Sequence, residues 1–174
     1  MSVFLLGPGG AGKSSTGAAL AQRLGLPFCD LDAQFIAAEG EPGHCIARHG
    51  YAGYAARNVE ICARTVARME RPAVLALSSG FMAYPSGVHP RHDALRRMLL
   101  RSPGSFVLLP ALELETCVAE TVRRQRERTF ARSAAREEEV IRTRFALYRE
   151  LPLPKITTMR PLAEVVDDLV RRVG

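Results

Sequence analysis

Long apolar runs are missing from this chain of 174 residues, in which no stretch approaches the ~18–20 consecutive apolar residues of a membrane-spanning helix. The first residues lead into an apolar segment without the charged start of a signal peptide, so we expect no export signal. Linkers, repeats and low-complexity tracts are missing too, and 47% hydrophobic residues suffice for one sizeable core. These absences predict a single domain over residues 1–174 with no membrane partner.

Cysteine patterns typical of metal binding or redox chemistry are missing as well. No C-x-x-C spacing occurs among the four cysteines, which are Cys29, Cys45, Cys62 and Cys117. His44 and His49 do not complete a zinc set with them. We therefore expect reduced, partly buried thiols in a cytoplasmic protein.

A phosphate-binding loop is the most informative feature that the chain does contain. Residues 7–14 read Gly-Pro-Gly-Gly-Ala-Gly-Lys-Ser, which fits G-x-x-x-x-G-K-[ST], and they follow the apolar run of residues 3–6. Backbone N–H groups of such a loop point at phosphate oxygens, Lys13 supplies charge to the β- and γ-phosphates, and Ser14 can bind Mg²⁺. We predict binding of ATP with Mg²⁺. The predicted nucleotide-binding residues here are Gly7, Gly9, Gly10, Ala11, Gly12, Lys13, Ser14 and Ser15.

The same glycines also allow a dinucleotide-binding interpretation. Gly7, Gly9 and Gly12 satisfy G-x-G-x-x-G, and acidic residues follow about 20 positions later at Asp30 and Asp32. However, the Lys-Ser pair has no role in that fingerprint, and 174 residues leave little room for a dinucleotide fold with a substrate domain. The phosphate-binding loop of a nucleoside triphosphate site is favoured.

Basic charge is concentrated in one segment. Residues 123–149 contain nine arginines and four glutamates, so they carry +5 of the net charge of +6. Basicity of this kind can indicate a nucleic-acid partner, but the segment holds only three aromatic residues (Phe130, Phe145 and Tyr148), too few to interleave with its arginines for base stacking, so we do not expect nucleic-acid binding. In a protein with a phosphate-binding loop, the arginines instead indicate a segment that closes over transferring phosphates.

Apolar segments and helical patterns alternate along the chain, which predicts an α/β fold with a parallel sheet covered on both faces. Strands are expected near residues 3–6, 27–32, 73–77, 105–109 and 155–157. Helices are expected near 13–24, before Gly40, and near 51–69, 91–101, 113–126, 136–150 and from 161. The fold class is thus a P-loop three-layer α/β/α sandwich with about five parallel strands. Ligands of such folds sit at the carboxyl ends of the strands.

Two aspartates end the second predicted strand. Asp30 and Asp32 are an i, i+2 pair, so a strand would place both side chains on one side of the ribbon. In a P-loop kinase, one carboxylate here can hold water of the Mg²⁺ shell and another can take a proton from the acceptor hydroxyl. The alternative is a helix N-cap, which Asp32 could serve at the same time.

Residues 7–32, GPGGAGKSSTGAALAQRLGLPFCDLD, resemble the opening of the shikimate kinase family. The resemblance extends along nearly the whole chain and is strongest in its first third. It implies a nucleoside-monophosphate-kinase-like fold with a lid, and ATP-dependent phosphoryl transfer to a hydroxyl of a small carboxylate-bearing metabolite, with shikimate as the leading candidate. By resemblance, Asp30 helps to organise Mg²⁺ and Asp32 contacts the acceptor.

Further family motifs imply the residues of an acceptor pocket, with an acceptor-binding subdomain near residues 32–62. Arg57 begins an R-x-x-E motif whose arginine binds the shikimate carboxylate, although it could instead form an i, i+3 pair with Glu60 on a helix surface. Arg144 begins an R-x-x-x-Y motif whose arginine grips the same carboxylate. The implied substrate-binding residues are Asp32, Arg57, Ser79, Gly80 and Arg144.

The acceptor pocket departs from the family at two places. Where the family carries Gly-Gly-Gly after the third strand, this chain has Ser78-Ser79-Gly80, which adds two Cβ atoms and two hydroxyls. Where the family usually has Phe before the R-x-x-E arginine, this chain has Ala56. The sequence therefore leaves the acceptor open, and it leaves open whether the two serines narrow the pocket or re-aim it.

The lid is expected near residues 123–136. By resemblance its arginine corresponds to Arg128, but the family's proline is missing there, so Arg124, Arg126 and Arg132 remain alternatives. Residues 158–161, Thr-Met-Arg-Pro, resemble the loop beside the adenine, which adds Arg160 and Pro161 to the nucleotide site together with Arg124.

The resulting hypothesis is a cytoplasmic ATP- and Mg²⁺-dependent kinase that acts as a monomer or weak dimer. Its predicted catalytic residues are Lys13, Asp32 and Arg128, and its predicted metal ligands are Ser14 and Asp30. Two alternatives remain: a P-loop kinase for another acceptor, such as a sugar acid, nucleotide or antibiotic, and a nucleotide-binding regulator without an acceptor. The carboxylate clamp argues against a regulator, because a pure switch does not need one.

Overall fold

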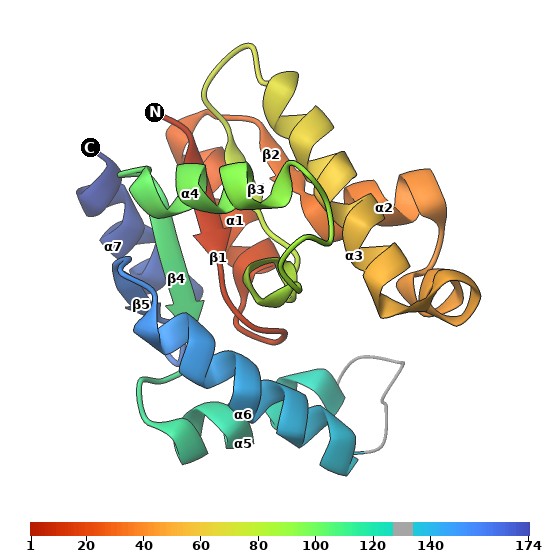
Figure 1. Cartoon of the computed structure of the whole chain (residues 1–174). Coiled ribbons are helices and arrows are strands. Elements are labelled where there is room, and N and C mark those ends of the chain that lie inside the picture. Colours follow the sequence, from red (N-terminus) through yellow and green to blue (C-terminus); the bar gives the residue numbers. More distant parts are fainter. Residues whose placement is uncertain (127–133) are drawn as a thin grey trace.

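A parallel five-stranded sheet forms the centre of the molecule (Figure 1). The structure is a computed structural model that describes the backbone of residues 1–126 and 134–174, and side chains of residues 1–124 and 138–174. The strand order is β2-β3-β1-β4-β5, and every pairing is parallel. The strands are β1 (Val3–Leu6), β2 (Phe28–Asp30), β3 (Val74–Ala76), β4 (Ser105–Leu109) and β5 (Lys155–Thr157). The predicted parallel sheet is confirmed.

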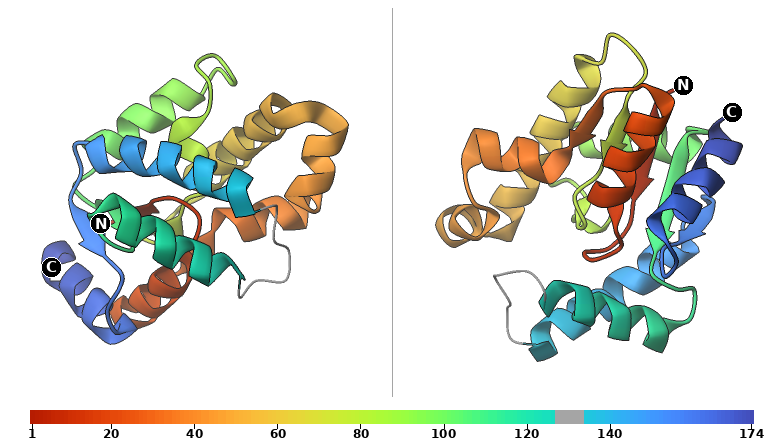
Figure 2. Two further views of the ribbon diagram at one scale, coloured as in Figure 1. Left: turned by 90° about the horizontal axis from the view of Figure 1, so that it is seen from below. Right: turned by 180° about the vertical axis from the view of Figure 1, so that it is seen from behind.

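Alternate residues of the strands face two different helix layers. On β1, Val3 and Leu5 lie in one buried cluster, whereas Phe4 and Leu6 lie in the other. The first cluster is completed by residues of α1 (Lys13–Leu24) and α7 (Leu162–Val173), which lie together on one side of the sheet (Figure 2). The second is completed by residues of α2 (Leu31–Glu39), α3 (Pro42–Ala67), α4 (His92–Arg101) and α6 (Ala134–Glu150). Because β1, β3 and β4 are buried on both faces, their sequences are almost continuously apolar.

The carboxyl ends of the strands face two helices that pack against each other. Helix α5 (Leu114–Arg126) and α6 lie below the arrowheads of β1 and β4, and α2 projects to one side with the first part of α3 (Figure 1). The loop between β1 and α1 and the loop after β3, which contains the 3₁₀ turn η1 (Phe81–Ala83), lie at this same edge. Ligand-binding loops are therefore gathered where parallel α/β sheets bind ligands.

Two sequence predictions differ from the structure in this region. The second strand ends at Asp30, and α2 begins at Leu31, so Asp30 and Asp32 do not share one side of a strand. Helix α3 begins at Pro42 rather than near residue 51, because a proline in the first turn needs no N–H partner. The break falls at Gly50 instead, whose φ of 69° and ψ of 172° interrupt the helix.

Among the parts of the chain that the structure describes, no helix is both long and apolar enough to span a membrane.

Candidate active site

The loop between β1 and α1 depends on glycine for its path. Gly7 has a φ of +146°, and a Cβ atom on it would lie 2.3 Å from the carbonyl oxygen of Leu108 on β4. Gly12 is the N-cap of α1 with a φ of 86°, which directs the chain into the helix. These conformations bend the backbone back over the end of the sheet, as a phosphate-binding loop requires.

Lys13 is folded across this loop. Its side chain is buried, and its Nζ atom donates hydrogen bonds to the carbonyl oxygens of Gly7 at 2.8 Å and Pro8 at 2.9 Å. The ammonium group is thus held at the mouth of the loop by backbone acceptors. A phosphate oxygen would be a stronger partner for the same group, because a charge-assisted bond to an anion exceeds one to a neutral carbonyl.

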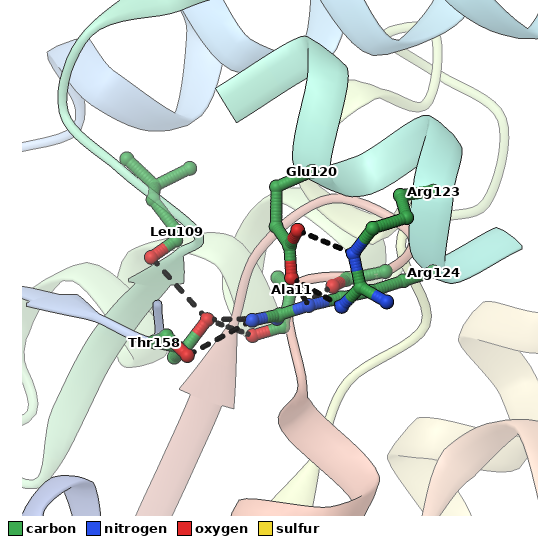
Figure 3. A network of polar contacts seen from close by, with 7 residues as sticks. Ala11, Leu109, Glu120, Arg123, Arg124 and Thr158 are labelled. Carbon is green, nitrogen blue, oxygen red and sulfur yellow. Dashed lines mark hydrogen bonds and ion pairs between the residues drawn. The ribbon is translucent and has the colours of Figure 1, made fainter. Parts of the chain in front are cut away.

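Arg124 joins three segments around the loop (Figure 3). Its Nη1 atom donates to the carbonyl oxygen of Gly10 at 3.1 Å and to Thr158 Oγ1 at 3.0 Å, and Nη2 donates to the carbonyl oxygen of Thr158 at 2.9 Å. Nε donates to Glu120 Oε1 at 2.6 Å. Hydrogen bonds from Arg123 and Arg124 hold the pKa of Glu120 at about 2, well below its usual range. Helix α5 is therefore tied to the phosphate-binding loop and to the loop between β5 and α7.

A cavity of about 360 Å³ opens where these segments meet. Its size is typical of small-molecule sites. The residues that line it are Gly10, Gly12, Ser15, Thr16, Arg124, Thr158, Arg160, Leu162 and Val165. The structure thus brings together the glycine loop, Arg124 and Arg160 as the sequence predicted, whereas Pro161 is the N-cap of α7 at the edge of this region.

The guanidinium of Arg160 is held in place from both sides. Nε donates to the carbonyl oxygen of Thr157 at 3.0 Å, and Nη2 donates to Asp168 Oδ2 on α7 at 2.7 Å. The arginine thereby connects the end of β5 to α7, and it lines the cavity. Thr158 belongs to the segment of residues 158–161 that was predicted to lie beside the adenine, whereas Leu162 and Val165 were not predicted as lining residues, because only the approach of α7 to the loop identifies them.

Asp30 and Asp32 have different surroundings. Asp30 Oδ1 accepts from the backbone N–H groups of Asp32 at 2.9 Å and Ala33 at 3.3 Å, so Asp30 is the N-cap of α2. Asp32 lies in the first turn, and its Oδ1 accepts from the Ser78 hydroxyl at 2.5 Å. The predicted cap role therefore belongs to Asp30, and the side chain that reaches the loop after β3 is Asp32.

Three buried residues continue the contact of Asp32 inward. Ser78 Oγ accepts from Asn58 Nδ2 at 2.9 Å, and Asn58 Oδ1 accepts from the Tyr84 hydroxyl at 3.1 Å. The exposed fractions are 0% for Asn58, 1% for Ser78 and 4% for Tyr84. Burial raises the pKa of Tyr84, so this phenol remains a neutral donor in the ordinary pH range. Sequence reasoning missed Asn58 and Tyr84, because nothing in their spacing points to Ser78.

Arg144 meets the next residue of the same loop. Its Nη1 atom donates to Ser79 Oγ at 3.0 Å, and Nη2 donates to the Tyr51 hydroxyl at 3.4 Å. The Tyr148 hydroxyl donates to the carbonyl oxygen of Ser79 at 3.0 Å, which joins α6 to this loop. Consecutive serines thus contact a carboxylate and a guanidinium, and Ser79 and Arg144 are brought together as predicted.

Gly80 is needed here for space. Its φ of −93° is accessible to any residue, but a Cβ atom would lie 2.9 Å from both the Tyr51 hydroxyl and Tyr84 Cε1, and 3.2 Å from Arg144 Nη2. Tyr51, Tyr54 and Tyr84 form an aromatic cluster beside it, with ring centroids 6.0–6.2 Å apart. The cluster supplies aromatic surface beside the loop even though position 56 is alanine.

Arg57 does not pair with Glu60 as the alternative interpretation had it. Its Nε lies 3.2 Å from Glu39 Oε2, and Nη1 donates to the carbonyl oxygen of Gly53 at 3.1 Å. Glu60 instead lies near Arg64, His89 and Arg91. The Arg57 guanidinium is therefore held between α2 and α3, and in the described part of the chain no hydrogen bond or ion pair joins it to Arg144 or Asp32.

The remaining predicted lid arginines fall outside the described part of the chain. Arg128 and Arg132 lie within residues 127–133, and the side chain of Arg126 is also outside the description. Arg124 is the one candidate whose surroundings are known.

The oxygen donors at this edge of the sheet fit Mg²⁺. Ser14 is exposed in the first turn of α1, and Asp30 at the end of β2 keeps Oδ2 beyond the oxygen used for capping. Mg²⁺ prefers such hard oxygen ligands and is usually held by one or two protein groups together with phosphates and waters.

Comparison with known proteins identifies the relatives of this arrangement. The family sequence profile described as shikimate kinase matches residues 9–173. The chain belongs to the shikimate kinase family. A shikimate kinase of Geobacter metallireducens is 34% identical over 97% of this chain and 89% of its own length, and one of Syntrophus aciditrophicus is 30% identical over 98% and 90%.

Solved structures agree with this family in fold. A shikimate kinase from Acinetobacter baumannii, solved in complex with shikimate, superposes with a TM-score of 0.74 at 23% identity, over 99% of this chain and 92% of that chain. A deoxyadenosine kinase from M. mycoides has a TM-score of 0.58 at 10% identity, over 99% and 98%. The fold is thus that of shikimate kinases and related nucleoside kinases, as the sequence predicted.

Proposed function

We propose that this protein transfers the γ-phosphoryl group of ATP to a hydroxyl of shikimate. The observation that carries the proposal is the pair of consecutive serines that contacts Asp32 on one side and Arg144 on the other. Asp32, as general base, and Arg144, as the cation that binds the acceptor carboxylate, would thereby lie beside one loop, at the edge of the sheet that carries the P-loop. Membership of the shikimate kinase family supports the same reaction.

In the proposed reaction, the acceptor hydroxyl oxygen forms a bond to the γ-phosphorus while the bond from that phosphorus to the β,γ-bridging oxygen breaks. The hydroxyl proton passes to the carboxylate of Asp32, and ADP carries away the electron pair of the broken bond. Lys13 would leave its carbonyl partners to bind the β- and γ-phosphates. Arg144 and Arg57 would hold the acceptor carboxylate, which orients the hydroxyl for in-line attack.

The donor set for Mg²⁺ would be Ser14 directly and Asp30 through water. When bound, the ion would neutralise charge on the β- and γ-phosphates. Asp30 would keep its cap on α2 while it holds that water, because only its Oδ1 atom accepts from the helix.

We further propose that residues 32–62 form the acceptor-binding part of one domain and that residues 123–136 form a lid whose arginine is Arg128. Arg124 would instead belong to the nucleotide site, since it already contacts the P-loop and the segment that includes Arg160. Closure of a lid would exclude water and so suppress hydrolysis of ATP without transfer. We expect the enzyme to act as a monomer or weak dimer.

The test is release of ADP from Mg·ATP with and without shikimate, with Lys13→Ala as the blank. We expect turnover that depends on shikimate and is lost in the blank. ATP binding without stimulation by shikimate would contradict the proposed acceptor. Turnover in neither condition, despite intact ATP binding, would favour a regulatory role.

A second acceptor class is favoured by one specific observation. The Ser79 hydroxyl lies in the loop where the family has only glycine backbone, and it and the Tyr51 hydroxyl both accept hydrogen bonds from Arg144. These groups would suit another hydroxy acid with a different arrangement of hydroxyls. A panel of hydroxy acids and sugar acids, measured beside shikimate, separates the two candidates by kcat/KM.

A further inference from the structure

A directional chain of hydrogen bonds ends on Asp32. Tyr84 donates to Asn58 Oδ1 at 3.1 Å, Asn58 Nδ2 donates to Ser78 Oγ at 2.9 Å, and Ser78 donates to Asp32 Oδ1 at 2.5 Å. Tyr84, Asn58 and Ser78 are at least 96% buried, whereas Asp32 is exposed at the loop edge. The chain therefore runs from the core to the one member that a ligand can reach.

Only one proton arrangement satisfies every member of this chain. An ionised carboxylate accepts only, so the single hydroxyl proton of Ser78 must point at Asp32. Ser78 must then accept from the amide nitrogen of Asn58, which leaves the amide oxygen to accept from Tyr84. A buried polar group without a partner is costly, so each bond fixes the next.

We propose that Ser78 is a positioning residue that holds the carboxylate of Asp32 for proton transfer, an inference that rests on the proposed function. The Ser78 hydroxyl occupies Oδ1 and fixes the plane of the carboxylate, so Oδ2 is the oxygen that takes the acceptor's proton. Asn58 and Tyr84 act behind it by fixing the direction of the serine hydroxyl. No proton moves along the chain, because the amide cannot pass one on.

Ser78 stands where the shikimate kinase family carries glycine, and its role depends on the hydroxyl that it adds. A glycine at this place would offer no hydroxyl, and Asn58 Nδ2 would lose its acceptor inside the core. The backbone does not require glycine here, since no described residue other than glycine has a positive φ. The serine therefore adds a contact to the candidate base at no conformational cost.

The experiment compares the wild type with Ser78→Ala and uses Ser105→Ala as the matched control. Ser105 is 1% exposed like Ser78, but it lies at the amino-terminal end of β4, at the opposite edge of the sheet. Its Oγ atom has no hydrogen-bond partner among the described residues, so the control removes a buried hydroxyl without changing the hydrogen bonds that lead from Tyr84 to Asp32. The readouts are kcat and KM for shikimate.

We expect Ser78→Ala to lower kcat about 10-fold, with KM for shikimate changed less than about twofold, because orientation of the base is lost rather than binding. Ser105→Ala should leave kcat and KM unchanged.

Ser78→Cys provides a second variant if Ser78→Ala does not fold. It keeps a weaker donor, so its kcat should lie between those of the wild type and Ser78→Ala. A kcat that is the same in every Ser78 variant as in the wild type would overturn the positioning role, as would a change in KM without a change in kcat. A wild type that does not phosphorylate shikimate would overturn the proposed acceptor, and the same variants measured with the hydroxy acid that the wild type does phosphorylate would then decide the role of Ser78.

Discussion

Removal of the Arg124 guanidinium is expected to weaken ATP binding, because this one side chain organises three walls of the nucleotide cavity. It donates three hydrogen bonds to Gly10 and Thr158 and a fourth to Glu120, and its side chain is 22% exposed. At about 1 kcal/mol net for each bond from a partly buried cation, Arg124→Ala removes about 3 kcal/mol of contacts to the two loops. Part of these ~3 kcal/mol lowers the free energy of unfolding rather than the affinity for ATP.

The share of that loss that appears in ATP binding can be bounded. If one third to one half of the lost ~3 kcal/mol comes out of ATP binding, because the two loops are less ordered, the Kd for Mg·ATP rises about 5- to 12-fold. Arg124→Lys should fall between this variant and the wild type, because an ammonium keeps the charge but cannot make the same planar fork of bonds. Isothermal titration calorimetry with ATP measures both.

Arg123→Lys is the matched control for Arg124. Arg123 pairs with the same Glu120 from the same helix, but its side chain is 58% exposed and none of its described bonds reaches the P-loop. Its Kd for ATP should stay within about twofold of the wild type. An Arg124→Ala protein that binds ATP within twofold of the wild type would refute the role of Arg124 in organising the nucleotide cavity. An Arg123→Lys protein that weakens ATP binding as much as Arg124→Ala would refute it too.

Three further predictions concern the acceptor pocket and acid stability. Gly80→Ala should lower the free energy of unfolding by about 1–3 kcal/mol in urea titrations, because its Cβ would meet Tyr84 and Tyr51 at 2.9 Å; an unchanged midpoint would contradict that clash. Arg144→Lys should raise KM for the acceptor about 10-fold and leave the Kd for ATP unchanged, and a reversed pattern in kinetics and calorimetry would place Arg144 in the nucleotide site. Because the pKa of Glu120 is lowered to about 2, the ionised carboxylate contributes about 1 kcal/mol to folding stability above pH 4.5, and this contribution is lost toward pH 2. The difference in the free energy of unfolding between the wild type and Glu120→Gln should therefore shrink over that range, and a constant difference would contradict this.

The nucleotide end of the site could be predicted from the sequence because its determinants are local. Glycine at positions 7 and 12 is required by the backbone path of the loop itself, and Lys13 follows in the first turn of the helix that the loop enters. The strands at 3–6, 105–109 and 155–157 matched the structure for a related reason, since each is a short apolar or β-prone run bounded by loops.

The acceptor end could be predicted only in outline. Asp30 and Asp32 were expected to end a strand together, but Asp30 caps a helix, because its side-chain Oδ1 atom accepts from the backbone N–H groups of Asp32 and Ala33. The pairing of Arg57 with Glu39 rather than Glu60 depends on how α2 packs against α3, which no spacing along one helix reveals.

The sequence by itself therefore determined the P-loop, the parallel fold and membership of the shikimate kinase family, because a glycine loop and buried strands have requirements that neighbouring residues must meet. Only the tertiary structure decided which side chains meet around Asp32. Asn58 lies 20 residues before Ser78 and 26 residues before Tyr84 in the sequence. The three come together because α3 packs beside the loop that leaves β3. Contacts between distant segments follow from the packing of whole elements, and that packing is a property of the complete core rather than of any one motif.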